Sequence, residues 1–325
     1  LLEDGQRGVL QLPDFQRSWV WDEDRIKSLI ASISRAFPVG ALMTLDTGGE
    51  VNFKPRPLEG APAEATHVSP NSLLLDGQQR MTSLYQVTLR GKVVETVTPK
   101  NKKVKRWFYI DIRKALDPNI DREEAIVGVP DDRRVRTDFG REVITDLSTP
   151  EREYATLMYP VTKVFDWDRW QDGFDQYWKG DANEGARETF RKFKREVLEN
   201  FKYYRVPVIS LDRATSKEAV CVVFEKVNTG GKPLDAFELV TAMYAADGHE
   251  LRKDWYGDES HKGRHRRLVN TLRPADSEAG IIANVSNTDF LQAVSLFYTR
   301  DRRREAERAG KLGKELPAVT GNRQA

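Results

Sequence analysis

The sequence predicts a mixed α/β (α+β) fold, with a small mixed sheet followed by a mostly helical region. The short apolar run Ser72–Leu75 is typical of a buried strand, and Gln78–Leu89 directly after it has the composition of a helix. Val104–Ile112 is rich in aromatic residues and alternates between polar and apolar positions, as strands do. Asp22–Phe37 and Glu184–Tyr204 repeat apolar residues at helical spacing.

Local signals set the boundaries of the first elements. Acidic residues in the first turn and Pro38 at the end mark Asp22–Phe37 as a helix. Ala41–Leu45 is expected to be a strand, and Thr47–Pro70, which is rich in Gly, Pro and Glu, a surface loop. Gly91 is expected to close the helix that follows the Asp-Gly pair.

The second half of the chain has fewer signals. Arg205–Leu211 is expected to be a strand, and Thr215–Glu218 has the spacing of a capping box that opens a helix. Asn228–Gly231 ends that helix, and Asp235 caps the next one. Residues 113–204 match no motif that assigns them a role.

Composition narrows the class of protein. The chain has 325 residues, 39% of them hydrophobic, and seven tryptophans, which indicates an ordered globular protein. Fifty-two basic and fifty acidic residues leave a net charge of +2, so a nucleic-acid surface would have to be a local patch. A single cysteine, Cys221, excludes an internal disulfide and fits a reducing compartment. With no apolar run long enough to span a membrane and no signal peptide at the start, we expect a cytoplasmic protein.

The strand–Asp-Gly–helix junction is the strongest candidate site. A glycine lets the backbone approach a ligand, and the following helix start offers N–H groups to an anion, through Gly77, Gln78 and Gln79. Arg80 could grip phosphate oxygens, and Thr82 could add a hydroxyl to phosphate or metal. Asp76 either caps the helix or coordinates Mg²⁺. An Asp-Gly turn before a helix is common, so the pattern alone is weak.

Two further clusters could join this site. Gln16 and Arg17 supply hydrogen-bond donors beside two tryptophans, at positions 19 and 21, which suits a base or a phosphate. The alternative is that both tryptophans belong to the core and Arg17 pairs with an acid. Asn228 and Lys232 flank a Gly-Gly turn that could close over a phosphate. The alternative there is an ordinary helix end followed by a turn.

Other kinds of site have little support. The four histidines have no companion cysteine, which argues against a structural zinc site, and neither a Gly-x-Ser-x-Gly nor an HExxH motif occurs. The basic runs 261–267 and 300–304 could contact DNA phosphates, although such runs are more often solvated helix faces.

Taken together, the clusters resemble a known family. Pro13-x-Phe15-Gln16-Arg17, Phe37-Pro38-Val39-Gly40, the run Leu75–Leu84 containing Asp-Gly-Gln-Gln-Arg, and Phe224-x-x-x-Asn228-x-x-Gly231 occur in this order. The chain thus looks like the GmrS-type N-terminal domain of GmrSD-like type IV restriction enzymes and of the phosphorothioate-dependent defence protein SspE. That domain is similar in fold to ParB and sulfiredoxin. The resemblance runs from about Leu10 to Ala246.

The resemblance implies binding and hydrolysis of a nucleoside triphosphate, commonly GTP, with Mg²⁺, in a system that recognises modified or foreign DNA. It also implies a C-terminal HNH-type nuclease, and no His-Asn-His constellation follows Ala246. On this basis we expect Asp76, Gln79 and Arg80 to act in catalysis, with Asp76 also binding the metal. The expected nucleotide contacts are Gln16, Arg17, Gly77, Gln78, Thr82, Asn228 and Lys232.

These expectations divide the chain into three parts. Residues 1–115 would form a ParB/sulfiredoxin-like nucleotide-binding core, and residues 116–298 a mostly helical region that returns the Asn228 loop to the site. Residues 299–325 would be a basic linker toward an absent nuclease domain. Two alternatives stay open: a nucleotide sensor without hydrolysis, and a DNA-binding module in which the same cleft holds backbone phosphates.

Overall fold

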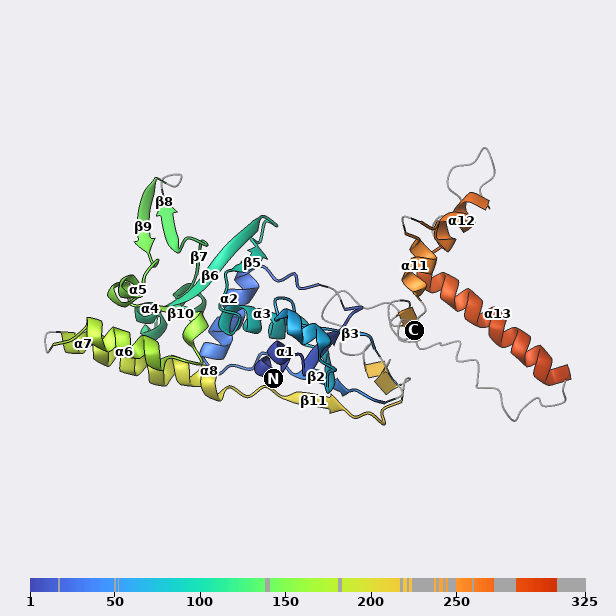
Figure 1. Cartoon of the computed structure of the whole chain (residues 1–325), viewed down its shortest axis with the longest axis horizontal. Coiled ribbons are helices and arrows are strands. Elements are labelled where there is room, and N and C mark those ends of the chain that lie inside the picture. The colour runs from blue at the N-terminus through green and yellow to red at the C-terminus, as the bar shows by residue number, and fades with distance from the viewer. Residues whose placement is uncertain are drawn as a thin grey trace. The chain divides into compact units, whose positions relative to one another are not determined.

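The computed structural model describes residues 1–16, 18–49, 51, 53–137, 141–180, 183–216, 250–258, 260–271 and 285–308, and a few single positions between 219 and 244. The chain forms two compact units (Figure 1). The first comprises Leu1–Val51 and Pro55–Ser216, and the second Asn52–Lys54 and Lys217–Ala325. The first unit therefore continues well beyond the boundary predicted at residue 115.

The first unit contains a five-stranded mixed sheet with the strand order β11-β2-β4-β1-β3. β4 lies in the centre, parallel to β1 and antiparallel to β2, while β11 adds to the outer edge of β2 in parallel. The strands are β1 (Leu10–Pro13), β2 (Leu42–Asp46), β3 (Pro55–Arg56), β4 (Ser72–Asp76) and β11 (Val208–Leu211). The predicted mixed sheet is confirmed, including the predicted strands at β2, β4 and β11.

Two helices pack against this sheet, α1 (Leu2–Arg7) and α3 (Gln78–Thr88). Met81 and Tyr85 of α3 are buried against the sheet because they repeat at i, i+4 on its inner face. The sheet side of this core consists of Leu10, Leu12, Leu42 and Leu74. The predicted surface loop before β4 also holds β3 and a short 3₁₀ turn, η1 (Ala63–His67), and it buries Leu58.

A second sheet is built around the long strand β6 (Lys103–Asp111), which confirms the predicted aromatic strand. β6 pairs in antiparallel fashion with β5 (Val94–Val97), β7 (Ile126–Val129) and β10 (Met158–Pro160). α4 (Ile112–Leu116) and the 3₁₀ turn η2 (Arg122–Ala125) connect β6 to β7. A separate two-stranded hairpin follows, made of β8 (Arg134–Thr137) and β9 (Glu142–Asp146).

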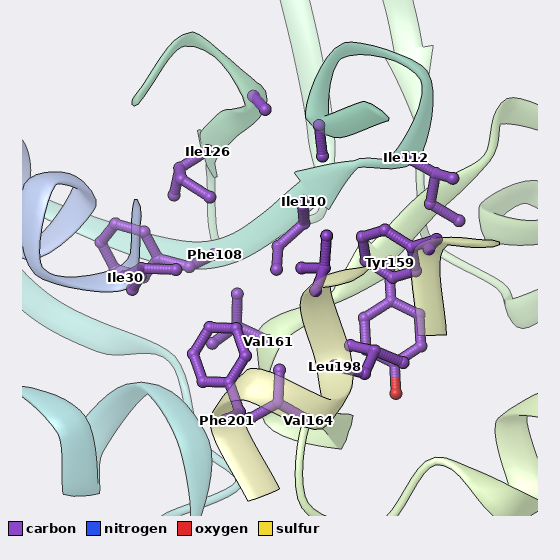
Figure 2. Packing of buried hydrophobic residues seen from close by; sticks show 14 of the residues in the cluster. Ile30, Phe108, Ile110, Ile112, Ile126, Tyr159, Val161, Val164, Leu198 and Phe201 are labelled. Atoms are coloured by element: carbon purple, nitrogen blue, oxygen red, sulfur yellow. The ribbon is translucent and has the colours of Figure 1, made fainter. Parts of the chain in front are cut away.

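Helix α2 (Glu23–Ser34) covers one side of the second sheet, and Asp22 caps it by accepting a hydrogen bond from the Arg25 amide. The Asp22–Phe37 prediction is thus confirmed to within a few residues. Figure 2 shows Ile30 of α2 against Phe108 of β6, with Val161 and Phe201 on the other side of the same core. This cluster is the largest core of the unit.

The remaining helices of the first unit bury aromatic side chains. They are α5 (Pro150–Thr156), η4 (Val161–Lys163), α6 (Asp168–Tyr177), α7 (Glu184–Phe193), the π-helical turn η6 (Lys194–Leu198) and α8 (Glu199–Tyr203). Tyr159, Trp170, Phe174, Phe190 and Phe193 contact one another in this layer. The predicted Glu184–Tyr204 helix therefore exists, but a π-turn divides it. The predicted "mostly helical" region also contains β7–β10, which the sequence analysis did not anticipate.

In the second unit, the helices with defined bounds are α11 (Leu251–Tyr256), α12 (Arg264–Thr271) and α13 (Asn287–Arg308), and a few helical residues are described between 219 and 244. α13 runs through Arg308, so the predicted basic linker is helical in its first part. The predicted helix after Thr215 and the Asn228 loop lie largely outside the described residues. No helix in the described part of the chain is both long and apolar enough to cross a bilayer.

Candidate functional site: the junction of β4 and α3

The site is a sharp turn at the carboxyl end of the central strand β4. Leu73–Leu75 are buried, and Gly77 then turns the chain into α3 with φ +90° and ψ 9°. A Cβ on Gly77 would lie 2.2 Å from Leu42 Cδ2 of the neighbouring strand. The left-handed φ and this close approach both require glycine, and they place the start of α3 at the end of the sheet.

Asp76 and Arg80 form an ion pair across this turn. Arg80 Nη2 lies 3.0 Å from Asp76 Oδ2, and the two side chains are 19% and 33% exposed. Asp76 makes no capping hydrogen bond to α3, so the expectation that it could be a helix cap is wrong. The spacing of four residues brings the carboxylate at the strand end to the guanidinium on the first turn of the helix.

Arg80 also holds the loop before β2. Its Nη1 donates to the Val39 carbonyl at 2.6 Å and its Nη2 to the Ala41 carbonyl at 2.9 Å. Gly40 lies between them with φ +87°, and a Cβ there would lie 2.7 Å from Arg80 Nη1. The guanidinium therefore joins three segments of the chain in this structure, instead of pointing unpaired into solvent.

Beside Arg80 lies a largely aliphatic cavity of about 650 Å³. Its walls include Val39, Leu42, Met81 and Leu84. Two cations, Lys202 of α8 and Arg205 just after it, also line it, as does one acid, Glu3. This volume and this mix of an apolar wall with a few cations fall within the usual range of small-molecule sites.

Gln16 and Gln79 hold the opposite flank of the junction. Gln16 Nε2 donates to the carbonyls of Leu74 and Leu75 at 3.1 and 2.7 Å, while its buried Oε1 has no hydrogen-bond partner among the described residues. Gln79 Oε1 accepts from the Val20 amide at 2.9 Å, and its Nε2 donates to the Ser18 carbonyl at 3.2 Å. Both carboxamides therefore fix the segment that precedes α2.

The structure places some of the predicted site residues near the junction, and others lie outside the described residues. Gln16 contacts the carbonyls at the end of β4, and Asp76 and Arg80 contact each other across the turn. Gln79 instead contacts the Ser18–Val20 segment. Of these four residues, Arg80 alone lines the neighbouring cavity. Gln78 is buried in the first turn. Thr82 is fully buried, and its hydroxyl has no hydrogen-bond partner among the described residues. Arg17, Asn228 and Lys232 lie outside the described residues, so their predicted contacts stay predictions.

Two further side chains support the junction, and sequence reasoning missed one of them, Tyr204. The Tyr204 hydroxyl donates to the Phe37 carbonyl at 2.7 Å and accepts from the Val39 amide at 3.1 Å. Trp19, expected either at a ligand or in the core, is half-buried and donates from Nε1 to Ser83 Oγ of α3 at 2.9 Å. No local pattern signals the Tyr204 contacts, because its partners lie 165 and 167 residues away in sequence.

A second buried polar group lies apart from the junction. Glu153 of α5 is 4% exposed, and its carboxylate accepts from the Tyr109 hydroxyl at 3.0 Å and from Trp170 Nε1 at 2.9 Å. Burial raises the pKa of Glu153, and the two hydrogen bonds oppose that shift only in part. This group joins α5, α6 and β6, and it has no link to the candidate site.

The described residues contain no group of three His, Cys, Asp or Glu side chains that could hold a metal ion. At the junction the candidate ligand is the Asp76 carboxylate, one oxygen of which is already paired with Arg80. Mg²⁺ commonly takes one or two carboxylates and completes its shell with water and substrate phosphates. Asp76 therefore fits an ion that arrives with phosphate groups, and it does not by itself form a metal site.

The fold and the junction define a mixed α+β domain with a glycine turn between its central strand and a helix. The family described as GmrSD restriction endonuclease, N-terminal domain, matches residues 1–245. The chain belongs to this family. An uncharacterized protein of Methanocaldococcus jannaschii is 26% identical over 262 residues, which cover 78% of this chain and 42% of that protein. The chain therefore spans less than half the length of that relative.

Proposed function

We propose that the β4–α3 junction binds and hydrolyses a nucleoside triphosphate, with GTP as the expected substrate. The observation that supports this most is the start of α3, which follows a glycine turn without a side-chain cap. Helix starts of this kind offer N–H groups and the positive end of the helix dipole to phosphate. The neighbouring cavity of about 650 Å³ has room for a nucleoside beside Arg80.

Arg80 would change partners when the triphosphate binds. In the structure its guanidinium pairs with Asp76 at 3.0 Å. Phosphate oxygens carry more charge than one carboxylate and match the planar fork of arginine, so they would compete for Nη2. That exchange would release the Asp76 carboxylate at the place where a water or a metal-bound phosphate would lie.

The other residues would have supporting roles. Gln79 is proposed to act with Asp76 and Arg80 in catalysis, since its carboxamide lies in the same first turn. Gln16 and Arg17, which follow β1, and Gln78 and Thr82 of α3 would contact the nucleotide. Asn228 and Lys232 would close over it. Mg²⁺ that enters with the triphosphate would be held by Asp76 and would neutralise charge on the phosphate oxygens. Hydrolysis would then depend on positioning and electrostatic stabilisation.

The wider role follows from the family. Membership among GmrSD restriction endonuclease N-terminal domains supports a part in a modification-dependent restriction or anti-phage system. We propose that nucleotide turnover here, together with recognition of modified or foreign DNA, controls a linked C-terminal nuclease. The greater length of the M. jannaschii relative leaves room for such a domain in that protein.

The test uses Asp76→Asn and Arg80→Lys, which keep side-chain size or charge. Binding would be measured by calorimetry, and phosphate release with each of the four NTPs, with and without modified DNA. Asp76→Asn should still bind nucleotide but lose phosphate release by on the order of 100-fold or more. Arg80→Lys keeps the charge and loses the planar fork, so its affinity should fall by about tenfold. Asp172→Asn, on the exposed face of α6, is the matched control.

Each other outcome points to a different function. Unchanged phosphate release in both variants would remove the junction as the hydrolytic site. Stoichiometric nucleotide binding without phosphate release in the unmodified protein would indicate a nucleotide sensor. Duplex DNA binding that falls steeply with salt and ignores nucleotide would indicate that the cleft holds backbone phosphates.

A further inference from the structure

The hairpin of β5 and β6 carries a concentrated positive charge. Its turn and the start of β6 hold five cations within seven residues: Lys100, Lys102, Lys103, Lys105 and Arg106. β5 opposite them contributes one acid, Glu95. The balanced charge of the whole chain hides this patch, so the sequence analysis passed over it.

The hairpin forms one wall of a groove of about 630 Å³. The other wall is the segment Trp19–Trp21, and Pro130 and Asp131 after β7 line a further part. Val20 is 52% exposed, and both tryptophans are half-buried. The groove therefore combines apolar and aromatic surface with cations, and none of its lining residues is Asp76, Gln79 or Arg80.

Hydrogen bonds fix the two walls relative to each other. Thr96 Oγ1 of β5 donates to the Trp21 carbonyl at 2.6 Å, and Asp22 forms a parallel bridge with Val97. Figure 1 shows α2, which begins directly after this segment, beside β5 and β6. The two walls of the groove are thus joined by hydrogen bonds within the first unit.

The lysines are accessible to a ligand. Arg106 is engaged by Glu23 of α2 at 3.0 Å, so it supports the wall. Lys105 pairs with Glu95 at 3.3 Å, but these side chains are 54% and 70% exposed, and exposed pairs of this kind are weak. Lys103 forms no ion pair with any described residue, and Asp131 is the one acid on the opposite rim among the lining residues. A polyanion would find two lysines in the groove and two more at the turn.

We propose that this groove binds a single strand of nucleic acid, with phosphates on Lys103 and Lys105 and a base against the Trp19–Trp21 segment. Sites for single strands commonly combine a basic track with aromatic side chains against which bases stack. Every nucleotide of a single strand carries a base that can lie against this segment, whereas an acidic peptide carries aromatic rings only where its sequence supplies them. The inference rests on the DNA part of the proposed function, and it does not require nucleotide hydrolysis at the junction.

The first test reverses the groove charge with the double variant Lys103→Glu/Lys105→Glu. The control is Lys192→Glu/Arg195→Glu, an equal change of charge on exposed positions of α7 and η6. Anisotropy of a labelled oligothymidylate would be measured over a range of salt concentrations, without nucleotide. The groove variant should bind about tenfold or more weakly, with a salt slope flatter by about 1.4. The control should bind within about twofold of the unmodified protein.

The second test leaves the lysines unchanged. Val20→Glu places a negative charge on the exposed wall of the groove, and Val143→Glu, at a 46% exposed position of β9, is its control. Val20→Glu should weaken oligothymidylate binding by about threefold or more while Val143→Glu does not. Melting temperatures of all variants should match that of the unmodified protein, since every changed side chain is exposed.

Several results would overturn the proposal. They are absence of oligothymidylate binding at low salt, equal loss in groove and control variants, binding of duplex but not of single strand, and equal competition by polyglutamate. The last of these would indicate an acidic protein partner. Loss of phosphate release in the junction variants leaves these measurements untouched, so failure of the hydrolase proposal and failure of the groove proposal are distinguishable.

Discussion

Replacing Arg80 by alanine tests whether its guanidinium holds the junction together. The side chain donates to three acceptors: the Val39 carbonyl at 2.6 Å, the Ala41 carbonyl at 2.9 Å and the Asp76 carboxylate at 3.0 Å. Arg80→Ala removes all three hydrogen bonds and leaves the acceptors without this donor. The loop before β2 would then lose its attachment to α3.

The expected cost follows from burial. Hydrogen bonds to charged groups contribute about 1.5–3 kcal/mol each, and breaking a fully buried ion pair costs about 3–5 kcal/mol. Asp76 is 33% exposed and regains water, so the cost here lies below the sum of these terms. We expect Arg80→Ala to lower the free energy of unfolding by about 2–4 kcal/mol. A double-mutant cycle with Asp76→Ala should give a coupling energy of about 1 kcal/mol.

Urea denaturation followed by tryptophan fluorescence suits this measurement. Six of the seven tryptophans belong to the first unit, at positions 19, 21, 107, 167, 170 and 178, so the signal reports mainly on that unit. Arg195→Ala is the control, because Arg195 is 70% exposed and pairs only with its neighbour Glu196 among the described residues. Its effect should stay within about 0.5 kcal/mol.

A loss of less than about 0.5 kcal/mol for Arg80→Ala, equal to that of the control, would refute the argument. The guanidinium would then have no structural role, and any loss of nucleotide binding in arginine variants would reflect direct contact alone. If Arg80→Ala loses about 2–4 kcal/mol of unfolding free energy but keeps its nucleotide affinity, the structural role is supported and the proposed exchange of partners is contradicted.

Two more predictions concern the turn and the buried acid. Gly77→Ala should lower the free energy of unfolding by about 1–3 kcal/mol, because it adds a Cβ at φ +90° and 2.2 Å from Leu42 Cδ2. Gly91→Ala is the control: its φ is +66°, but no atom lies within 4 Å of the added Cβ, so it should lose less. Equal losses of the two variants in urea denaturation would contradict the steric argument. The raised pKa of Glu153 means that its folded state binds the proton more tightly than the unfolded chain. Its contribution to stability is thus fully present below the ordinary value of 4.5 and is lost as the pH rises through the folded pKa. The melting temperature of the unmodified protein relative to Glu153→Gln should rise as the pH falls from neutral toward that value, and a pH-independent difference would show that Glu153 does not titrate differently on folding.

The junction was predictable because its signals are local. An apolar strand, a glycine and a helix follow one another within a short stretch of sequence, and the helix α2 carries its cap and apolar stripe in the same way. The strands β7 and β10 escaped prediction because each is only three or four residues long and depends on pairing with β6. Such pairing is not encoded in the composition of the segment itself.

The role of Arg80 was only half predictable for a similar reason. Its spacing from Asp76 is visible in the sequence, and the chemistry of the side chain indicates an anion. The carbonyls of Val39 and Ala41, which take up its other donors, come from a loop about forty residues away. The chemistry of backbone groups is the same at every position, so no residue type marks them as partners.

The position of β11 at the edge of the first sheet affects how the first unit folds and where its chain can be cut. β11 pairs with β2, and the Thr44 and Ser210 hydroxyls hydrogen-bond across 166 residues of sequence. During synthesis the outer edge of β2 therefore stays unpaired until nearly the whole first unit has left the ribosome. A fragment that stops before Val208 would keep that edge unpaired, and open edges recruit strands from other molecules. A chain that ends before Val208 should therefore aggregate more than one that keeps the whole first unit through Ser216, which size-exclusion chromatography would measure.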